Sequence, residues 1–312
     1  MAMDQEPTHL STESLFASAQ RFMKSALSDL EHKRMDMALL HLGVAIEHLA
    51  KAYLASISLS LVVDPKHVTS LFYAVGVNRK KYAELVLTIS MKDALKRVAM
   101  LLETFPFRKP EDDLKDLIHT RNGIAHAAMW NPRYGEKAFI LGLQTAEHLV
   151  LAIGKDAATF WGQYRAKVSV MMRDRRLAIK DIAAVRIEAA KREFESRFGS
   201  DVDEDLLRKI EGVPAGLSTD DAAPVTCPAC GRLGYVQGDS ELEGEPDWDI
   251  ADGEPYFNGV YVFWELRVNS FACQVCKLEL PTRELVEEAG IPTEIELRPA
   301  TKEEEGDYYL DY

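Results

Sequence analysis

Arg121, Asn122 and His126 are the residues of this sequence whose side chains and spacing are best suited to chemistry. They stand in a segment with helical periodicity, so Asn122 and His126, four apart, share a face, and Arg121 lies about 100° from Asn122. A histidine can take the proton of a ribose 2′-hydroxyl or return one to a leaving oxygen near neutral pH. An arginine can hold the phosphate with two hydrogen bonds as negative charge develops. The set is suited to cleaving RNA without a metal ion.

Spacing alone leaves a structural interpretation open, because such pairs also occur in helices that have no catalytic role. In that case Arg121 forms a surface ion pair and His126 is a satisfied, half-buried ring. We expect the helix that carries them to open at residues 109–113, where a proline and three acids suit the positive end of a helix. We expect Pro132 to end it.

The run from Arg121 to His126 resembles the R-x4-H motif of the HEPN superfamily, including the asparagine that often follows the arginine. An earlier apolar run, residues 37–54, resembles the long second helix of that family with its internal acidic residue. The resemblance covers residues 10–170. It implies a helical bundle that dimerises, so that two R-x4-H motifs meet and form one composite ribonuclease site. A HEPN fold that only binds or scaffolds is the alternative.

Glu47 is the internal acidic residue of that earlier helix. One interpretation is an exposed i,i+4 ion pair with Lys51, worth a few tenths of a kcal/mol. The other is that Glu47 orients Arg121 or His126 from a neighbouring helix. The sequence does not choose between the two.

Two further groups of residues are candidates for contact with RNA, one basic and one following the motif. They are Arg79, Lys80, Lys81, Trp130, Arg133 and Tyr134. The basic cluster can bind phosphate or be a solvated helix face. The aromatic and arginine side chains can stack on unpaired bases, whereas in the structural interpretation the tryptophan closes the end of the bundle.

The C-terminal region contains a second constellation, C-x2-C…C-x2-C, with 42 residues between the two pairs. Its members are Cys227, Cys230, Cys273 and Cys276. Four thiolates complete a tetrahedron around zinc and leave no open position, so the zinc would be structural. Two disulfides or redox pairs are the alternative. With the strand-like run at residues 256–268, the region resembles a zinc ribbon, interrupted by an acidic insertion at residues 239–253.

Charge and residue types divide the 312-residue chain into two chemically different parts. Residues 1–175 contain 23 Lys and Arg against 19 Asp and Glu, which gives +4. The remainder contains 14 against 31, which gives −17 and completes the total of −13. All eight histidines lie in the first part and all four cysteines in the second. We therefore predict a HEPN-like helical domain at 1–172, a charged helix and linker at 173–224, and a zinc-ribbon domain at 225–312.

The predicted fold class is mainly α: an N-terminal HEPN-like bundle with a long helical extension, followed by a small α+β zinc-ribbon domain. Apolar stripes predict helices from Ser11 or Thr12, over residues 35–59, over residues 91–104, and in a long stretch over 135–172 that continues to residue 198. No apolar run reaches the ~20 residues of a membrane span. The N-terminus lacks a signal segment, so we expect a cytoplasmic protein without membrane contact.

These patterns predict a metal-independent endoribonuclease of defence, toxin–antitoxin or stress response. RNA is the expected substrate, a homodimer the expected assembly, and zinc the expected structural cofactor. The acidic ribbon is expected to sense a trigger or dock a protein partner, because its charge opposes nucleic acid. A non-catalytic adaptor that dimerises or binds a nucleotide is the alternative. The acidic tail, residues 303–312, is interpreted either as a disordered end or as a segment that covers the basic bundle and restrains it.

Overall fold

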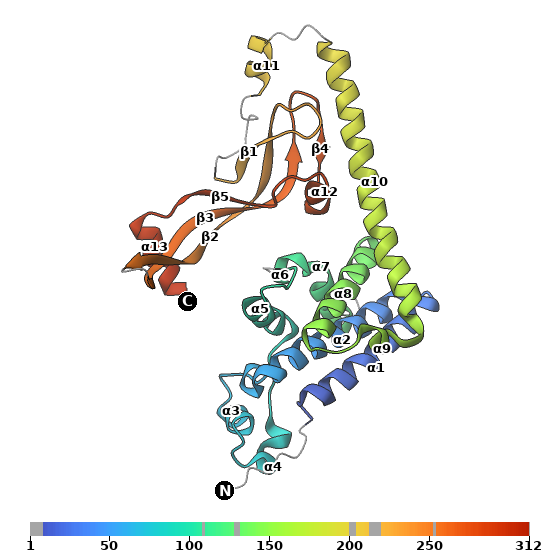
Figure 1. Ribbon diagram of the computed structural model, residues 1–312. Helices are drawn as coiled ribbons and strands as arrows, with labels where there is room; N and C mark the ends of the chain where they lie inside the picture. The colour runs from blue at the N-terminus through green and yellow to red at the C-terminus, as the bar shows by residue number, and fades with distance from the viewer. Residues whose placement is uncertain are drawn as a thin grey trace. The chain divides into compact units, whose positions relative to one another are not determined.

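The computed structural model describes residues 9–107, 110–127, 132–199, 204–211, 220–251 and 254–311. The chain divides into two compact units, Met1–Arg175 and Arg176–Tyr312. Helices make up the first unit, and a small antiparallel sheet belongs to the second, in agreement with the predicted fold class (Figure 1). Among the described residues, no helix combines the length and the apolar character that a membrane crossing requires.

The first unit is built from short and long helices joined by tight connections. In chain order they are α1 (Thr12–Glu31), α2 (Met35–Ile57), η1 (Leu59–Leu61), α3 (Val68–Ala74), α4 (Arg79–Tyr82), η2 (Ala83–Leu85), α5 (Met91–Leu101), α6 (Pro110–Asp113), α7 (Lys115–Ala127), α8 (Pro132–Ala152), α9 (Ala157–Trp161), η3 (Gly162–Tyr164) and the start of α10 (Arg165–Phe198). The Ser11 hydroxyl caps α1 by accepting a hydrogen bond from the Ser14 amide.

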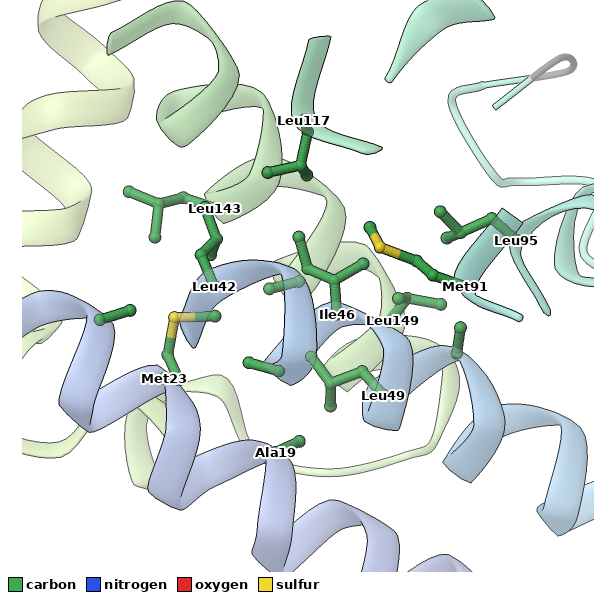
Figure 2. Close-up of a cluster of buried hydrophobic side chains, with 14 of the residues drawn as sticks. Ala19, Met23, Leu42, Ile46, Leu49, Met91, Leu95, Leu117, Leu143 and Leu149 are labelled. Carbon is green, nitrogen blue, oxygen red and sulfur yellow. The ribbon is translucent and has the colours of Figure 1, made fainter. Parts of the chain in front are cut away.

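Helix α2 is the central element of this unit. Its side chains are apolar nearly all round, which is typical of a helix buried on several sides. Figure 2 shows Leu42, Ile46 and Leu49 of α2 between α1, on which Ala19 lies, and α8, on which Leu149 lies. Residues of α5 and α7 complete the same core. The central helix therefore has neighbours on several faces, and one of them is the helix that carries the R-x4-H motif.

Three sequence predictions about helix ends are wrong. The motif helix does not open at residues 109–113, because residues 110–113 form the separate short helix α6 and α7 begins at Lys115. Pro132 does not end the motif helix but begins α8, where its missing N–H and fixed φ suit the first helical position. The long stretch predicted over residues 135–172 is three helices, because α8 ends at Ala152 and Gly154 follows with a φ of +73°. The Asp156 carboxylate then caps α9, and Gly162, with a φ of +54°, separates α9 from α10.

The second unit contains α11 (Glu204–Ile210), α12 (Arg283–Glu288), α13 (Lys302–Asp311) and one five-stranded antiparallel sheet. Its strands are β1 (Ala222–Thr226), β2 (Leu233–Ala251), β3 (Glu254–Ala272), β4 (Glu279–Leu280) and β5 (Glu294–Pro299). The strand order is β1-β2-β3-β4, and β5 also pairs with β3. Residues 239–251 of the predicted acidic insertion belong to β2, and residues 252–253 lie outside the described residues. Strand β2 pairs with β3 from Tyr235↔Ala272 to Ala251↔Glu254.

The C-terminal part of α10 packs within the second unit. Ala183 and Ala190 are buried in its core, and Ile187 and Phe194 pack against that core. Arg197 donates a 2.6 Å hydrogen bond to the Val275 carbonyl oxygen. The charged helix is therefore part of the second unit's core.

The acidic tail is not a disordered end, because it forms α13. The Arg298 guanidinium holds Glu304 through two hydrogen bonds of 2.7 and 2.9 Å, which lower the pKa of the Glu304 carboxyl. Gly244 of β2 leaves room for Tyr308, because a Cβ at position 244 would stand 2.5 Å from the Tyr308 hydroxyl oxygen. The tail thus packs on the sheet of its own unit.

Candidate functional site

The motif helix approaches the central helix at Gly43. A Cβ at this position of α2 would stand 2.6 Å from Cγ of Arg121 and 3.0 Å from its Cβ. Such distances do not occur between packed carbon atoms, so the absence of a side chain at Gly43 creates the passage for Arg121. Helix α2 therefore determines where the guanidinium of Arg121 lies.

Two partners orient the guanidinium of Arg121. Its Nη2 donates a 2.9 Å hydrogen bond to Oε2 of Glu47, and its Nη1 donates a 2.9 Å hydrogen bond to Oδ1 of Asn122. The Arg121 side chain is 24% exposed and that of Glu47 is 14% exposed. The nitrogen Nε is buried and has no hydrogen-bond partner among the described residues. These contacts use two of the five N–H groups of an arginine.

Glu47 also forms the i,i+4 ion pair with Lys51. Its second oxygen, Oε1, lies 2.6 Å from Nζ of Lys51, one turn along α2. Lys51 is not on an exposed stripe, however, because it is only 4% exposed. Its ammonium also donates a 3.0 Å hydrogen bond to Oγ1 of Thr88. The carboxylate of Glu47 thus lies between two cations, and the chain Thr88–Lys51–Glu47–Arg121 fixes its position in a partly dehydrated region.

His48 is a neighbouring histidine that the sequence analysis did not single out. Its ring packs edge-on against Phe22, with the ring centroids 5.6 Å apart. Its Nδ1 is buried without a hydrogen-bond partner in the described part of the chain. Burial lowers the pKa of His48, because the charged imidazolium loses its hydration, although the carboxylate of Glu47 opposes this effect. His48 is therefore held in its neutral form more strongly than a solvated histidine.

His126 lies in the last turn of α7 and is exposed, as is Asn122. Because α7 is continuous over Lys115–Ala127, these two side chains lie one turn apart on the same face. No hydrogen bond joins His126 to another of the described residues. The structure thus brings Arg121, Asn122 and Glu47 together and leaves the imidazole of His126 open to solvent.

The basic cluster of α4 lies apart from this group. Helices α4 and α7 lie at opposite ends of the first unit (Figure 1). The Arg79 guanidinium donates hydrogen bonds of 3.2 and 3.4 Å to the Tyr73 and Ala74 carbonyl oxygens, so it caps the end of α3. Lys80 and Lys81 are exposed. Within one chain, the structure therefore does not place this cluster beside Arg121.

The residues predicted to stack on RNA bases fall largely outside the part of the chain that the structure describes. Trp130, and the side chains of Arg133 and Tyr134, are outside the described residues. The backbone of Arg133 and Tyr134 belongs to the first turn of α8.

The four cysteines converge in the second unit and could hold a metal ion. Their sulfur atoms all lie within 4.8 Å of one another. The Sγ atoms of Cys227 and Cys276 are 3.5 Å apart, and those of Cys230 and Cys273 are 3.7 Å apart. A zinc ion with four bonds of about 2.3 Å requires sulfurs about 3.8 Å apart at tetrahedral geometry. The four free thiols therefore fit a closed zinc site, in which the ion would be structural.

Two turns of the same form hold these cysteines. The Cys227 amide donates to the Arg232 carbonyl over 2.8 Å, and the Cys273 amide donates to the Leu278 carbonyl over 2.9 Å. The residue after the second cysteine of each pair has a positive φ, +70° at Gly231 and +61° at Lys277. Positive φ folds the chain back, so that both sulfurs of a pair face the same point.

Sequence reasoning missed Gly43 and the burial of Lys51. A glycine inside a strongly helical run is a usable signal, because it costs helix stability unless a close approach requires it. No sequence signal indicated the burial of Lys51, because an i,i+4 Glu–Lys pair is typical of an exposed helix face.

A comparison with known protein families finds a similarity in the first unit. Residues 12–121 match the family model of the HEPN domain, and this match ends at Arg121, before His126. Neither a curated protein nor a solved structure matches the sequence. The match covers α1 through most of α7, which is the part of the first unit that contains Gly43, Glu47 and Arg121. Residues 12–121 are therefore similar to the HEPN domain.

Proposed function

We propose that this protein is a metal-independent endoribonuclease whose active site contains Arg121, Asn122 and His126. Arg121 binds the scissile phosphate, and His126 transfers protons. Asn122 and Glu47 hold the guanidinium in place. The observation that carries the proposal is the state of Arg121: two partners fix its orientation, while its other donors, including the buried Nε, have no partner among the described residues.

The Arg121 side chain is 24% exposed, so a ligand can approach the N–H groups of Nη1 and Nη2 that Asn122 and Glu47 do not use. A phosphate oxygen is a suitable acceptor for an arginine that still has free N–H groups. The carboxylate of Glu47 does not neutralise Arg121 alone, because Lys51 shares it. The group Lys51–Glu47–Arg121 therefore has a formal charge of +1, which favours an anion.

The reaction that these groups can perform is transfer of the phosphate to the ribose 2′-oxygen. A neutral His126 removes the 2′-hydroxyl proton, and the 2′-oxygen forms a bond to phosphorus while the bond to the 5′-oxygen breaks. A protonated histidine returns a proton to the 5′-oxygen. The products are a 2′,3′-cyclic phosphate and a 5′-hydroxyl. In a homodimer, the His126 side chains of the two protomers can serve as the base and the acid.

The zinc ribbon would serve in sensing or docking. Trp248 and Phe257 form an edge-on ring pair, 5.5 Å between centroids, with exposed fractions of 62% and 55%. The strand that contains Trp248 is rich in Asp and Glu. Exposed aromatic side chains in acidic surroundings suit a basic protein partner better than RNA.

The decisive experiment compares the wild type with the variants His126→Ala and Arg121→Lys. Total RNA from cells that express each protein would be sequenced for new 5′ ends. The purified proteins would be assayed on the same RNA with and without EDTA. We expect wild-type cleavage that persists in EDTA, carries cyclic-phosphate ends and disappears in the His126 variant. Arg121→Lys keeps the charge but loses the two-point hydrogen bonding, so we expect strongly reduced cleavage.

Cleavage that is equal in the wild type and His126→Ala would refute the assigned site. Absence of cleavage in all three proteins, with intact dimers, would favour the non-catalytic adaptor.

A further inference from the structure

A cavity of about 550 Å³ lies in the first unit, and its lining contains no residue of the motif helix. The end of α1, the turn that follows it, the second turn of α2 and the turn η3 line this cavity. Its size falls in the range of small-molecule sites, about 300–1,000 Å³. A lysine, an arginine and three hydroxyl-bearing side chains belong to its lining.

Asp29 organises the charged side of the cavity. It is only 6% exposed. Its Oδ1 accepts hydrogen bonds from Nε and Nη2 of Arg34 over 3.0 and 2.5 Å, and its Oδ2 lies 2.6 Å from Nδ1 of His41. Because an ionised carboxylate only accepts hydrogen bonds, Nδ1 of His41 carries the proton. The other ring nitrogen, Nε2, is left for a ligand.

The pKa of the Asp29 carboxyl agrees with this arrangement. Burial by itself raises the pKa of Asp29, but the hydrogen bonds from Arg34 and His41 outweigh it, so the pKa lies below the ordinary value. Asp29 is therefore ionised at neutral pH and holds both basic side chains at the cavity wall.

Several donors in the cavity have no protein partner. The Lys24 ammonium is exposed, and no hydrogen bond or ion pair joins it to another of the described residues. Nη1 of Arg34 and the hydroxyl groups of Ser25 and Ser28 are likewise unengaged as donors within the described part of the chain. The formal charges of Lys24, Arg34 and Asp29 add to +1.

A second, smaller cavity of about 360 Å³ gives a contrast within the same unit. Its lining contains Glu84 and two leucines but neither lysine nor arginine. The second cavity therefore lacks the cations that line the first.

We propose that the cavity at Asp29 is a binding site for a phosphate monoester of a small molecule. A phosphate monoester is an anion, which suits the positive sum of the lining, and it offers several acceptor oxygens to donors that come from different segments of the chain. This proposal is independent of the proposed ribonuclease activity, because it uses neither Arg121 nor His126.

Isothermal titration calorimetry of the full-length protein tests this site. The probes are ribose 5-phosphate and adenosine 5′-monophosphate, with inorganic phosphate alongside and ribose as the control without phosphate. A short 2′-O-methylated RNA with a 5′-phosphate, which cannot be cleaved through its 2′-oxygen, tests the end of an RNA as the alternative source. We expect saturable binding of at least one small phosphate monoester and none of ribose.

Lys24→Met is the informative variant, because this side chain has no structural partner to lose. We expect it to weaken binding about tenfold or more, the usual effect of losing one charged hydrogen bond. His41→Gln should weaken binding as well. Lys92→Met removes an exposed lysine of α5 and is the matched control, so its affinity should equal that of the wild type.

Four results would overturn the proposal. They are no binding of any small phosphate at millimolar concentration, unchanged affinity in Lys24→Met, binding of the 5′-phosphorylated RNA alone, and loss of binding in Arg121→Ala. The last would place the phosphate in the proposed ribonuclease site. Conversely, cleavage could fail in every assay while phosphate binding at Lys24 remains intact.

Discussion

Gly43 of α2 lies directly against the side chain of Arg121 of α7, and a Cβ at position 43 would stand 2.6 Å from Cγ of that arginine. The contact joins a residue of the central helix to the residue that would bind phosphate. It explains why a glycine occurs inside α2, although most other residues of this helix favour helical structure.

Gly43→Ala should reduce the rate of RNA cleavage at least about tenfold. The new methyl group would displace the guanidinium of Arg121, and a displacement of a fraction of an ångström removes much of the contribution of a positioned group to the rate. Alanine favours a helix by about 1 kcal/mol over glycine, while overpacking costs about 1–3 kcal/mol, so the free energy of unfolding should change little. Cleavage rates and denaturant unfolding of the two proteins give the measurement. Gly306→Ala is the control, because a Cβ there meets no atom within 4 Å. Full activity in Gly43→Ala would show that the position of Arg121 does not matter.

Glu47→Gln should both loosen Arg121 and destabilise the bundle. The variant keeps the shape of the side chain but leaves the buried ammonium of Lys51 without its anion. Loss of one partner of a buried ion pair costs about 3–5 kcal/mol, and the remaining Thr88 contact reduces that loss only in part. Urea unfolding of Glu47→Gln, of Lys51→Met and of the double variant would measure the coupling. Additive losses would mean that the two side chains do not act together.

His48 should make the first unit less stable as the pH falls. Its pKa is lowered in the folded state, so below the ordinary value of 6.5 the unfolded chain binds a proton that the folded chain does not. Stability is therefore lost as the pH falls from about 7 towards 5, and His48→Gln should lose less over this interval. Denaturant unfolding at pH 7.5, 6.5 and 5.5 measures the difference. His119→Gln, at an exposed position of α7, is the control and should follow the wild type.

Removal of zinc should unfold the second unit and spare the first. The four-cysteine site belongs to the core of the second unit, whereas the main core of the first unit contains none of these cysteines. Structural zinc contributes about 10–16 kcal/mol of binding free energy in small domains. We expect one zinc ion per chain by elemental analysis and loss of one of two calorimetric transitions in Cys273→Ser. A protein that contains no zinc and still shows both transitions would contradict the assigned site.

Local sequence patterns predicted the structure correctly where interactions between residues close in sequence determine it. The hydroxyl of Ser11 predicts the start of α1, the continuous apolar surface of residues 37–54 predicts a central helix, and the two C-x2-C pairs predict a site that four sulfurs then form. The ends of helices were predicted less well. Pro132 suits both the end of one helix and the beginning of the next, and only the structure distinguishes the two cases.

The sequence by itself determined the types of groups available: an arginine, an asparagine and a histidine on one helix, an acid on another, and four paired cysteines. Only the tertiary structure decided which of them meet. Glu47 contacts Lys51 and Arg121 at once because α2 and α7 cross at Gly43, and the distance between Glu47 and Arg121 along the chain contains no information about that crossing. The pairing of Asp29 with His41 likewise depends on the turn between α1 and α2. Packing between elements, and not periodicity within them, determines contacts between residues that are distant in sequence.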